Sequence, residues 1–137
     1  MSATDSATGE DAAIRRLIDD WAGAVRRRDV PGILRHHARD MLMFDVPSPF
    51  QSKGIAAYEE TWATFFAWAP TPAVFDIREM SITAGDDVAF ATAAMRCAGL
   101  DSDGATTPLD FRLTVGLRKI DGQWTICHEH HSVPADE

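Results

Sequence analysis

Four alternating segments fill the second half of the chain, and they constrain the fold more than any other feature. Apolar and polar residues alternate over residues 73–82, 88–98, 108–120 and 123–133, which is typical of strands with one buried face. Turn-forming residues separate the segments, and Asp121-Gly122 between the last two is a strong signal for a two-residue hairpin. The second half of the chain is therefore expected to form a largely antiparallel sheet.

The first half of the chain has helical spacing instead. Apolar residues recur every three or four positions over residues 11–25, and again over residues 54–68, where Pro70 and Pro72 end the pattern. A short helix from Asp29 to about Arg39 and a short apolar strand over residues 41–47 are expected between them. Helices followed by a run of strands predict an α+β fold, with the helices gathered on one face of a curved sheet.

Length and charge limit the classes of function. The 137 residues are expected to form a disordered tail over residues 1–10 and a single domain over residues 11–134. The net charge of −8 and the lack of a long basic run argue against a nucleic-acid partner. Neither a signal pattern nor an apolar run of membrane-spanning length occurs, which predicts a cytoplasmic protein with no membrane partner. Cys97 and Cys127 lie in expected strands without CxxC spacing, as reduced core cysteines do.

The short strand over residues 41–47 carries one acidic residue. Strand alternation places Asp45 on the same face as Met41 and Met43. A carboxylate on an apolar face is costly to ionise, and this is the condition that suits a general base or acid near neutral pH. The alternative is an aspartate at a strand end that accepts backbone hydrogen bonds from the following loop.

The sequence HEHHS at residues 128–132 is the other candidate for chemistry. Regular alternation places His128 and His130 on the core face with Trp124, and it places Glu129 and His131 on the outer surface. Glu129 and His131 are therefore expected to contact solvent or a second subunit.

Three interpretations remain open for His128 and His130. They could bind a ligand or relay protons with Asp45, or they could form hydrogen bonds inside a partly polar pocket. They could also hold a metal ion, with a further ligand from His37, Asp45 or Glu79.

The chain resembles the SnoaL-like and ketosteroid isomerase-like branch of the nuclear transport factor 2-like superfamily. The resemblance rests on RRRDVPGILRHHARD leading to MLMFDVPSPFQSKG, on Trp62 to Phe66, and on LRKIDGQWTICHEHHSVP. It implies a cone-shaped barrel in which a strongly curved antiparallel or mixed sheet wraps three N-terminal helices around an apolar pocket. It also implies a homodimer that forms through the outer face of the sheet.

The resemblance implies a role for Asp45, which falls where the isomerase pattern has the aspartate that moves a proton next to a carbonyl. The isomerase also stabilises its dienolate with a tyrosine and a protonated aspartate. Those two positions read Trp21 and about Val115 here, so the chain is not expected to be a true steroid isomerase.

A small-molecule pocket would be lined by the aromatic and apolar residues of the helices and nearby strands. In the pair His36-His37, placed on the second helix, His37 is expected to point inward. The predicted substrate-binding residues are Trp21, His37, Met43, Tyr58, Trp62, Phe65, Phe66 and Trp124. Arg96, Asp110 and Arg112 are expected on the outer face of the sheet.

The favoured function is a cofactor-independent isomerase, cyclase or dehydratase that acts on a small apolar or carbonyl-containing molecule. Asp45 would be the general base, with His128 or His130 assisting. A non-catalytic protein that binds a small hydrophobic ligand is the main alternative, and a His-based metalloprotein is a further one. No phosphate-binding loop, nucleophile elbow or cofactor fingerprint occurs in the sequence, so neither a cofactor nor a metal is expected.

Overall fold

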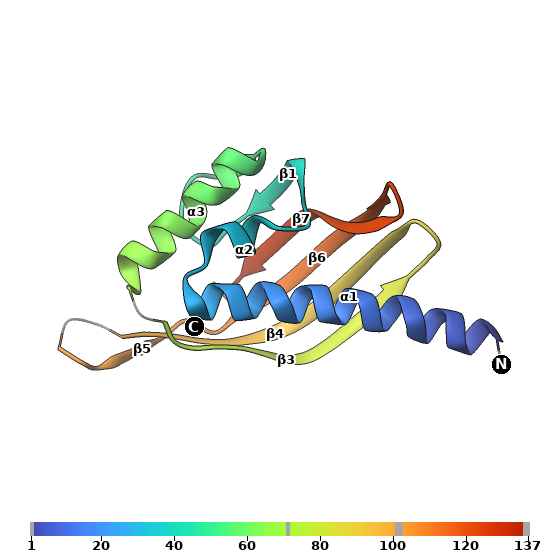
Figure 1. Ribbon diagram of the computed structural model, residues 1–137. Coiled ribbons are helices and arrows are strands. Elements are labelled where there is room, and N and C mark those ends of the chain that lie inside the picture. The colour runs from blue at the N-terminus through green and yellow to red at the C-terminus, as the bar shows by residue number, and fades with distance from the viewer. Residues whose placement is uncertain (1, 71, 101–102, 136–137) are drawn as a thin grey trace.

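The computed structural model describes residues 2–70, 72–100 and 103–135. The three helices lie against one face of a curved sheet, with α1 crossing its long strands (Figure 1). This arrangement confirms the predicted α+β class. In chain order the elements are α1 (Ser2–Arg27), α2 (Val30–Leu34), β1 (His37–Phe44), β2 (Ser52–Lys53), α3 (Ile55–Trp68), β3 (Pro72–Ala84), β4 (Val88–Leu100), β5 (Thr106–Pro108), β6 (Phe111–Ile120) and β7 (Gln123–Ser132).

The sheet is mixed and open. Its strand order is β2-β1-β7-β6-β4-β3, and β5 pairs with β4. Strands β1 and β7 run parallel, and the other pairs are antiparallel. The curved mixed sheet and the three helices implied by the resemblance are confirmed, and within the described residues no ladder joins β2 to β3, so the sheet is not closed. Helices pack near both edges of the sheet: α1 packs on β3, and α3 packs on β1 and β2.

Two helix boundaries differ from the sequence expectation. Helix α1 begins at Ser2, inside the segment expected to be a tail. Helix α2 ends at Leu34, although Asp29 caps its start as predicted by accepting a hydrogen bond from the Gly32 N–H. Arg35 has an extended backbone with ψ of 142°, which ends helical geometry, His36 has a positive φ of 64°, and His37 is the first residue of β1. The placement of His36 and His37 on a helix was therefore wrong.

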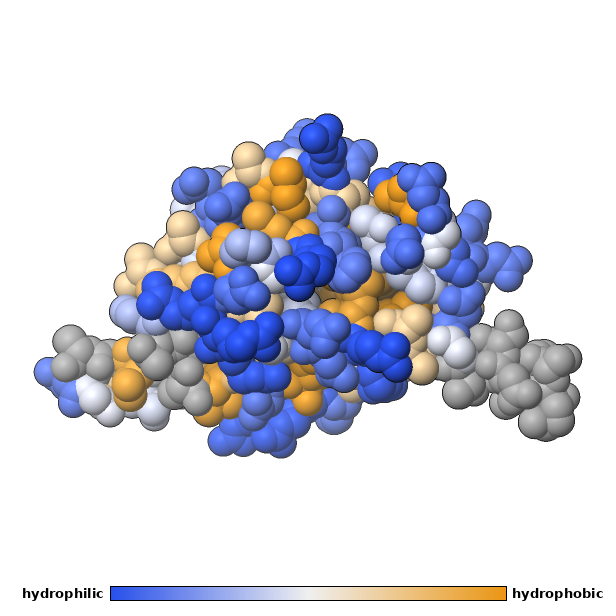
Figure 2. Space-filling view, in the orientation of Figure 1, coloured by the Kyte–Doolittle hydropathy of each residue, from blue (hydrophilic) through white to orange (hydrophobic). Residues whose placement is uncertain are grey.

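The remaining elements agree closely with the sequence pattern. Helix α3 and the four long strands are present, and Asp121-Gly122 joins β6 to β7 with positive φ at both residues (51° and 79°), as a two-residue hairpin requires. The core fills the space between the helices and the sheet, whereas the visible surface is mostly hydrophilic with small apolar patches (Figure 2). In the described part of the chain, no helix is long and apolar enough to span a bilayer.

One extra residue in β7 decides which side chains face the helices. Gly116 of β6 pairs with His128, but the next residue, Leu117, pairs with Ile126, so Cys127 has no partner in β6. A β-bulge of this kind shifts the alternation of side chains beyond it by one position. Ile126 and Glu129, three residues apart, are consequently both buried on the inner face.

The pairing of β1 with β7 contains a second irregularity. His37 pairs with Ile126 and Leu42 pairs with His128, so five steps along β1 (37 to 42) match two steps along β7 (126 to 128). Regular pairing then resumes, with Met43 opposite Glu129. The irregular stretch allows His37 and the end of β1 to approach the same part of β7.

Candidate functional site

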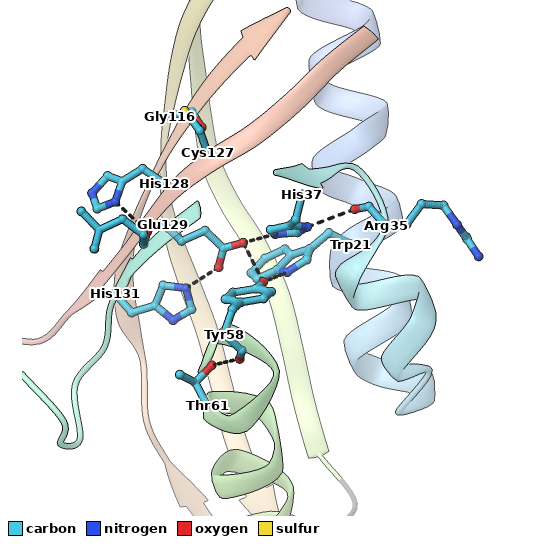
Figure 3. Close-up of polar contacts among 11 residues, drawn as sticks. Trp21, Arg35, His37, Tyr58, Thr61, Gly116, Cys127, His128, Glu129 and His131 are labelled. Carbon is cyan, nitrogen blue, oxygen red and sulfur yellow. Dashed lines mark hydrogen bonds and ion pairs between the residues drawn. The ribbon is translucent and has the colours of Figure 1, made fainter. Parts of the chain in front are cut away.

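The two faces of HEHHS are the reverse of the sequence expectation. Glu129 is 0% exposed and His131 is 6% exposed, so both point into the molecule. His130 is exposed, and the Nδ1 atom of His128 lies 2.8 Å from the Leu42 carbonyl oxygen. His128 points away from the buried side chains of the same strand (Figure 3). The prediction that His128 and His130 face the pocket was wrong, because it assumed regular alternation through Cys127.

Glu129 is the centre of a buried hydrogen-bond network (Figure 3). Its Oε2 atom accepts a hydrogen bond from the Tyr58 hydroxyl at 2.7 Å and lies 2.6 Å from His37 Nε2. Its Oε1 atom lies 3.0 Å from His131 Nε2. The Trp21 indole N–H donates to the Tyr58 hydroxyl at 2.9 Å. The carboxylate is thus held from α3, β1 and β7, and through Tyr58 from α1.

The surroundings of His37 fix its protonation. Its Nε2 atom faces the Glu129 carboxylate, and its Nδ1 atom lies 3.0 Å from the Arg35 carbonyl oxygen. Both partners accept hydrogen bonds, so each ring nitrogen of His37 must carry a proton. His37 and Glu129 therefore form a buried ion pair, in which both side chains are almost fully inaccessible.

Electrostatics agrees with an ionised Glu129. Burial is the largest influence on this carboxyl group and acts to raise its pKa. The hydrogen bonds from His131 and His37, together with their charges, outweigh burial and lower the pKa of Glu129 from 4.5 to about 2. Burial and the neighbouring Glu129 charge raise the pKa of Tyr58 well above its usual range, so Tyr58 stays a neutral donor.

His131 links this network to the residue that the sequence singled out first. Its Nε2–H is directed at Glu129, and its Nδ1 atom lies 3.7 Å from Asp45 Oδ1. Phe111 stacks on the imidazole ring, with centroids 4.8 Å apart. Asp45 follows β1 directly, its side chain is 19% exposed, and its Oδ1 accepts a hydrogen bond from the Val46 N–H at 2.8 Å. Asp45 and His131 therefore lie side by side.

Asp45 and His131 are the titratable side chains, among the described residues, in the wall of a largely apolar cavity of about 420 Å³ that three threonines also line. Aromatic side chains from α3, β3 and β6 make up much of the remaining wall. The lining residues are Met43, Asp45, Val46, Pro47, Thr61, Trp62, Thr64, Phe65, Trp68, Phe75, Thr107, Pro108, Leu109, Phe111 and His131. The volume and the few convergent polar groups are typical of small-molecule sites.

The structure divides the predicted pocket residues between the cavity wall, the Glu129 network and positions outside both. Met43, Trp62 and Phe65 line the cavity together with Asp45. Trp21, His37 and Tyr58 lie behind it, in the Glu129 network.

Phe66 and Trp124 lie outside the cavity wall. Phe66 packs beneath the Arg28 guanidinium, 5.2 Å from the ring centroid. The Trp124 indole N–H donates to Glu10 at 2.7 Å, near the start of the chain. Arg96, Asp110 and Arg112 are exposed, as predicted.

Sequence reasoning missed the inward position of Glu129 and His131. Their residue types did indicate a polar site, because a glutamate flanked by histidines can form a charged hydrogen-bond network. Their faces could not be read without the bulge. Among the described residues, no group of three or more His, Cys, Asp or Glu side chains is arranged to hold a metal ion. His128 and His130, the ligands of the metal hypothesis, lie on the outer face.

Comparison with known proteins identifies the family. The model of the SnoaL-like domain matches residues 14–136, which is most of the chain. The chain belongs to the SnoaL-like domain family. No curated protein matches this SnoaL-like chain.

Solved structures share the fold. An NTF2-like protein of unknown function from Pseudomonas putida KT2440 is 36% identical, with a TM-score of 0.83 over 94% of this chain and 89% of that chain. A protein of the NTF2-like family from Streptomyces avermitilis, provisionally named a dehydratase, is 12% identical, with a TM-score of 0.81 over 93% and 98%. The association domain of CaMKII from C. elegans is 17% identical, with a TM-score of 0.74 over 94% and 99%. At such low identities the last two show the fold alone.

Replacing Glu129 by Gln should destabilise this SnoaL-like chain strongly. The substitution removes the charge that balances His37 and puts an amide N–H₂ among side chains that already donate. Loss of one member of a buried ion pair costs roughly 3–5 kcal/mol, so we expect a loss of that order in the free energy of unfolding measured with urea. The matched control is Asp40→Asn, because the Asp40 side chain is 80% exposed and its pair with Arg118 spans 3.6 Å. A Glu129→Gln protein as stable as the control would contradict the ion pair.

The same carboxylate should make stability depend on acidity. Because the pKa of Glu129 falls from 4.5 to about 2 on folding, its ionised form contributes stability that is fully present above about pH 4.5 and is lost as the pH falls towards 2. The shift corresponds to a contribution on the order of 3 kcal/mol. Urea unfolding between pH 7 and 3 should show a steeper decline for the native sequence than for Glu129→Gln. Parallel curves would show that Glu129 does not titrate in this way.

Proposed function

We propose that the chain is a cofactor-independent acid–base catalyst of the isomerase, cyclase or dehydratase kind, acting on a small apolar molecule in the 420 Å³ cavity. One observation carries the proposal: a buried carboxylate, Glu129, holds the cavity-lining His131 beside Asp45. A carboxylate that fixes the tautomer of a histidine is a recurring device for proton transfer.

The two cavity residues have different tasks in this proposal. Asp45 accepts the proton from the substrate, as the sequence analysis expected. Glu129 holds the proton on Nε2 of His131, so Nδ1 faces Asp45 and the cavity and can take up a proton and return it. His131 thus takes the role that the sequence analysis gave to His128 and His130.

The apolar side chains of the cavity wall support proton transfer by the polar pair. Trp62, Phe65 and Phe111 surround the polar pair with apolar surface, which strengthens electrostatic interactions between catalyst and substrate. The provisional name of the Streptomyces avermitilis protein is in line with a dehydration. In such a step Asp45 would take a proton from carbon while His131 donates one to the departing hydroxyl group, so a double bond forms and water leaves.

A non-catalytic ligand-binding protein is the second candidate. It is favoured by the scarcity of hydrogen-bond donors at the cavity wall, because a carbonyl oxygen that gains negative charge needs donors for stabilisation. The main buried donor at the wall is the Trp62 indole N–H, which has no hydrogen-bond partner among the described residues. Turnover of a substrate separates the two candidates.

Ring opening of 5-nitrobenzisoxazole tests the proposed base without knowledge of the natural substrate. This reaction needs only one base that removes a carbon-bound proton, and its phenolate product absorbs visible light. We expect turnover that falls by about 100-fold or more in Asp45→Asn, in the range of general base catalysis. Asp40→Asn, at an exposed aspartate of β1, the strand that Asp45 follows, should keep the native rate. A native protein no faster than buffer, or an Asp45→Asn protein as fast as the native one, would reject Asp45 as a base.

We also propose that two copies pair through the outer face of the sheet. That face exposes apolar side chains of β4, with Val88 60% and Phe90 51% exposed. Exposed apolar surface of this kind commonly marks an interface. Light scattering after size exclusion should give the mass of a dimer, and Phe90→Glu should give a monomer that remains folded. A native protein with the mass of one chain would exclude this pairing.

A further inference from the structure

Asp45 and Thr61 line the cavity and carry oxygen atoms that can accept hydrogen bonds. His131 donates from Nε2 to Glu129, and its Nδ1 atom lies on the side of Asp45, 3.7 Å from Oδ1. Thr61 donates its hydroxyl proton to the Tyr58 carbonyl oxygen at 2.6 Å, which leaves the lone pairs of that hydroxyl. The Asp45 carboxylate only accepts.

The Asp45 carboxylate receives few hydrogen bonds from the protein. Its Oδ1 atom receives the Val46 N–H, and no described residue donates a hydrogen bond to its Oδ2 atom. His131 Nδ1, at 3.7 Å, is too far for a hydrogen bond. Glu129, by contrast, receives three hydrogen bonds and pairs with His37. The two carboxylates near the cavity therefore differ: Glu129 is satisfied within the protein, and Asp45 is not.

The remaining wall favours positive charge. No Lys or Arg lines the cavity in the described part of the chain. Trp62, Phe65, Phe75 and Phe111 contribute aromatic rings that pack against one another mostly edge to face. The faces of such rings attract cations by roughly 0.5–2 kcal/mol each, and more where water is excluded.

Three classes of ligand can be compared for this cavity. An anion would meet the Asp45 carboxylate, and His131, the one basic side chain among the described lining residues, already pairs with Glu129 and Asp45, so an anion is disfavoured. A neutral apolar ligand would displace water from Asp45 without supplying a donor, and a buried charge without a partner is costly. An ammonium group supplies N–H donors and positive charge to Asp45, and its apolar body packs against the aromatic rings.

We propose that this cavity binds a hydrophobic amine that is protonated at neutral pH, with its ammonium group hydrogen-bonded to Asp45 Oδ2 and its apolar body against Trp62, Phe65 and Phe111. The inference rests on the cavity of the proposed function and names the substrate class of that site. The net charge of −8 would also favour the approach of a cation.

Three probes with one naphthalene skeleton test the charge preference: 2-naphthylmethylamine, 2-naphthalenemethanol and 2-naphthoate. Isothermal titration calorimetry at pH 7 should give an affinity for the amine at least about 10-fold higher than for the alcohol, and no measurable binding of the naphthoate. A hydrogen bond to a charged group accounts for a difference of this size. Because all three probes are compared on the native protein, this result does not depend on the folding of a variant.

Asp45→Asn then tests the assigned partner. The variant should bind the amine about 10-fold more weakly or worse, and it should bind the alcohol within about 3-fold of the native protein. Asp40→Asn should leave both affinities unchanged. The proposal is overturned if the native protein binds the alcohol or the naphthoate as tightly as the amine, or if Asp45→Asn weakens amine and alcohol equally.

These measurements are independent of the catalytic test. Preferential amine binding with no opening of 5-nitrobenzisoxazole would reject the catalyst and leave an amine-binding protein. Ring opening that depends on Asp45, together with no preference for the amine, would reject only the amine.

Discussion

The buried carboxylate of Glu129 is the interaction on which the rest of the site depends. An ionised carboxylate without water needs several donors and a compensating charge, and it obtains them from three elements: Tyr58 on α3, His37 on β1 and His131 on β7. Tyr58 extends the link to Trp21 on α1. The network therefore joins two helices to two strands, and it fixes the orientation of the one histidine among these residues that reaches the cavity.

This arrangement exists because β7 is irregular. With regular alternation after Ile126, His128 and His130 would face the helices, and Glu129 would point to the outer surface. The unpaired Cys127 reverses this order, and the irregular pairing of β1 brings His37 to the same carboxylate. Bulges are common next to functional sites because they redirect a side chain without breaking the sheet. In this chain two irregular stretches face each other across the β1–β7 ladder.

Sequence patterns predicted the parts of the structure that depend on periodicity and turn chemistry. The alternation of Met41, Met43 and Asp45 placed Asp45 on the cavity side, and Asp121-Gly122 placed the last hairpin. The patterns failed where a single backbone conformation decides the outcome. The positive φ of His36 and the unpaired Cys127 have no signature in residue type, and each moved a histidine from its expected position.

The two carboxylates show how stability and ligand recognition are divided within one small site. Glu129 has all its partners inside the protein, so it contributes to the folded state whether or not the cavity is filled. Asp45 receives one backbone hydrogen bond and lies 3.7 Å from His131, and no described residue donates to its Oδ2 atom. His131 lies between them and is ordered by one carboxylate while it faces the other. Functional positions are expected where local interactions are left incomplete, and this criterion is the reason why the proposed function and the proposed ligand both centre on Asp45 rather than on the more conspicuous histidine cluster.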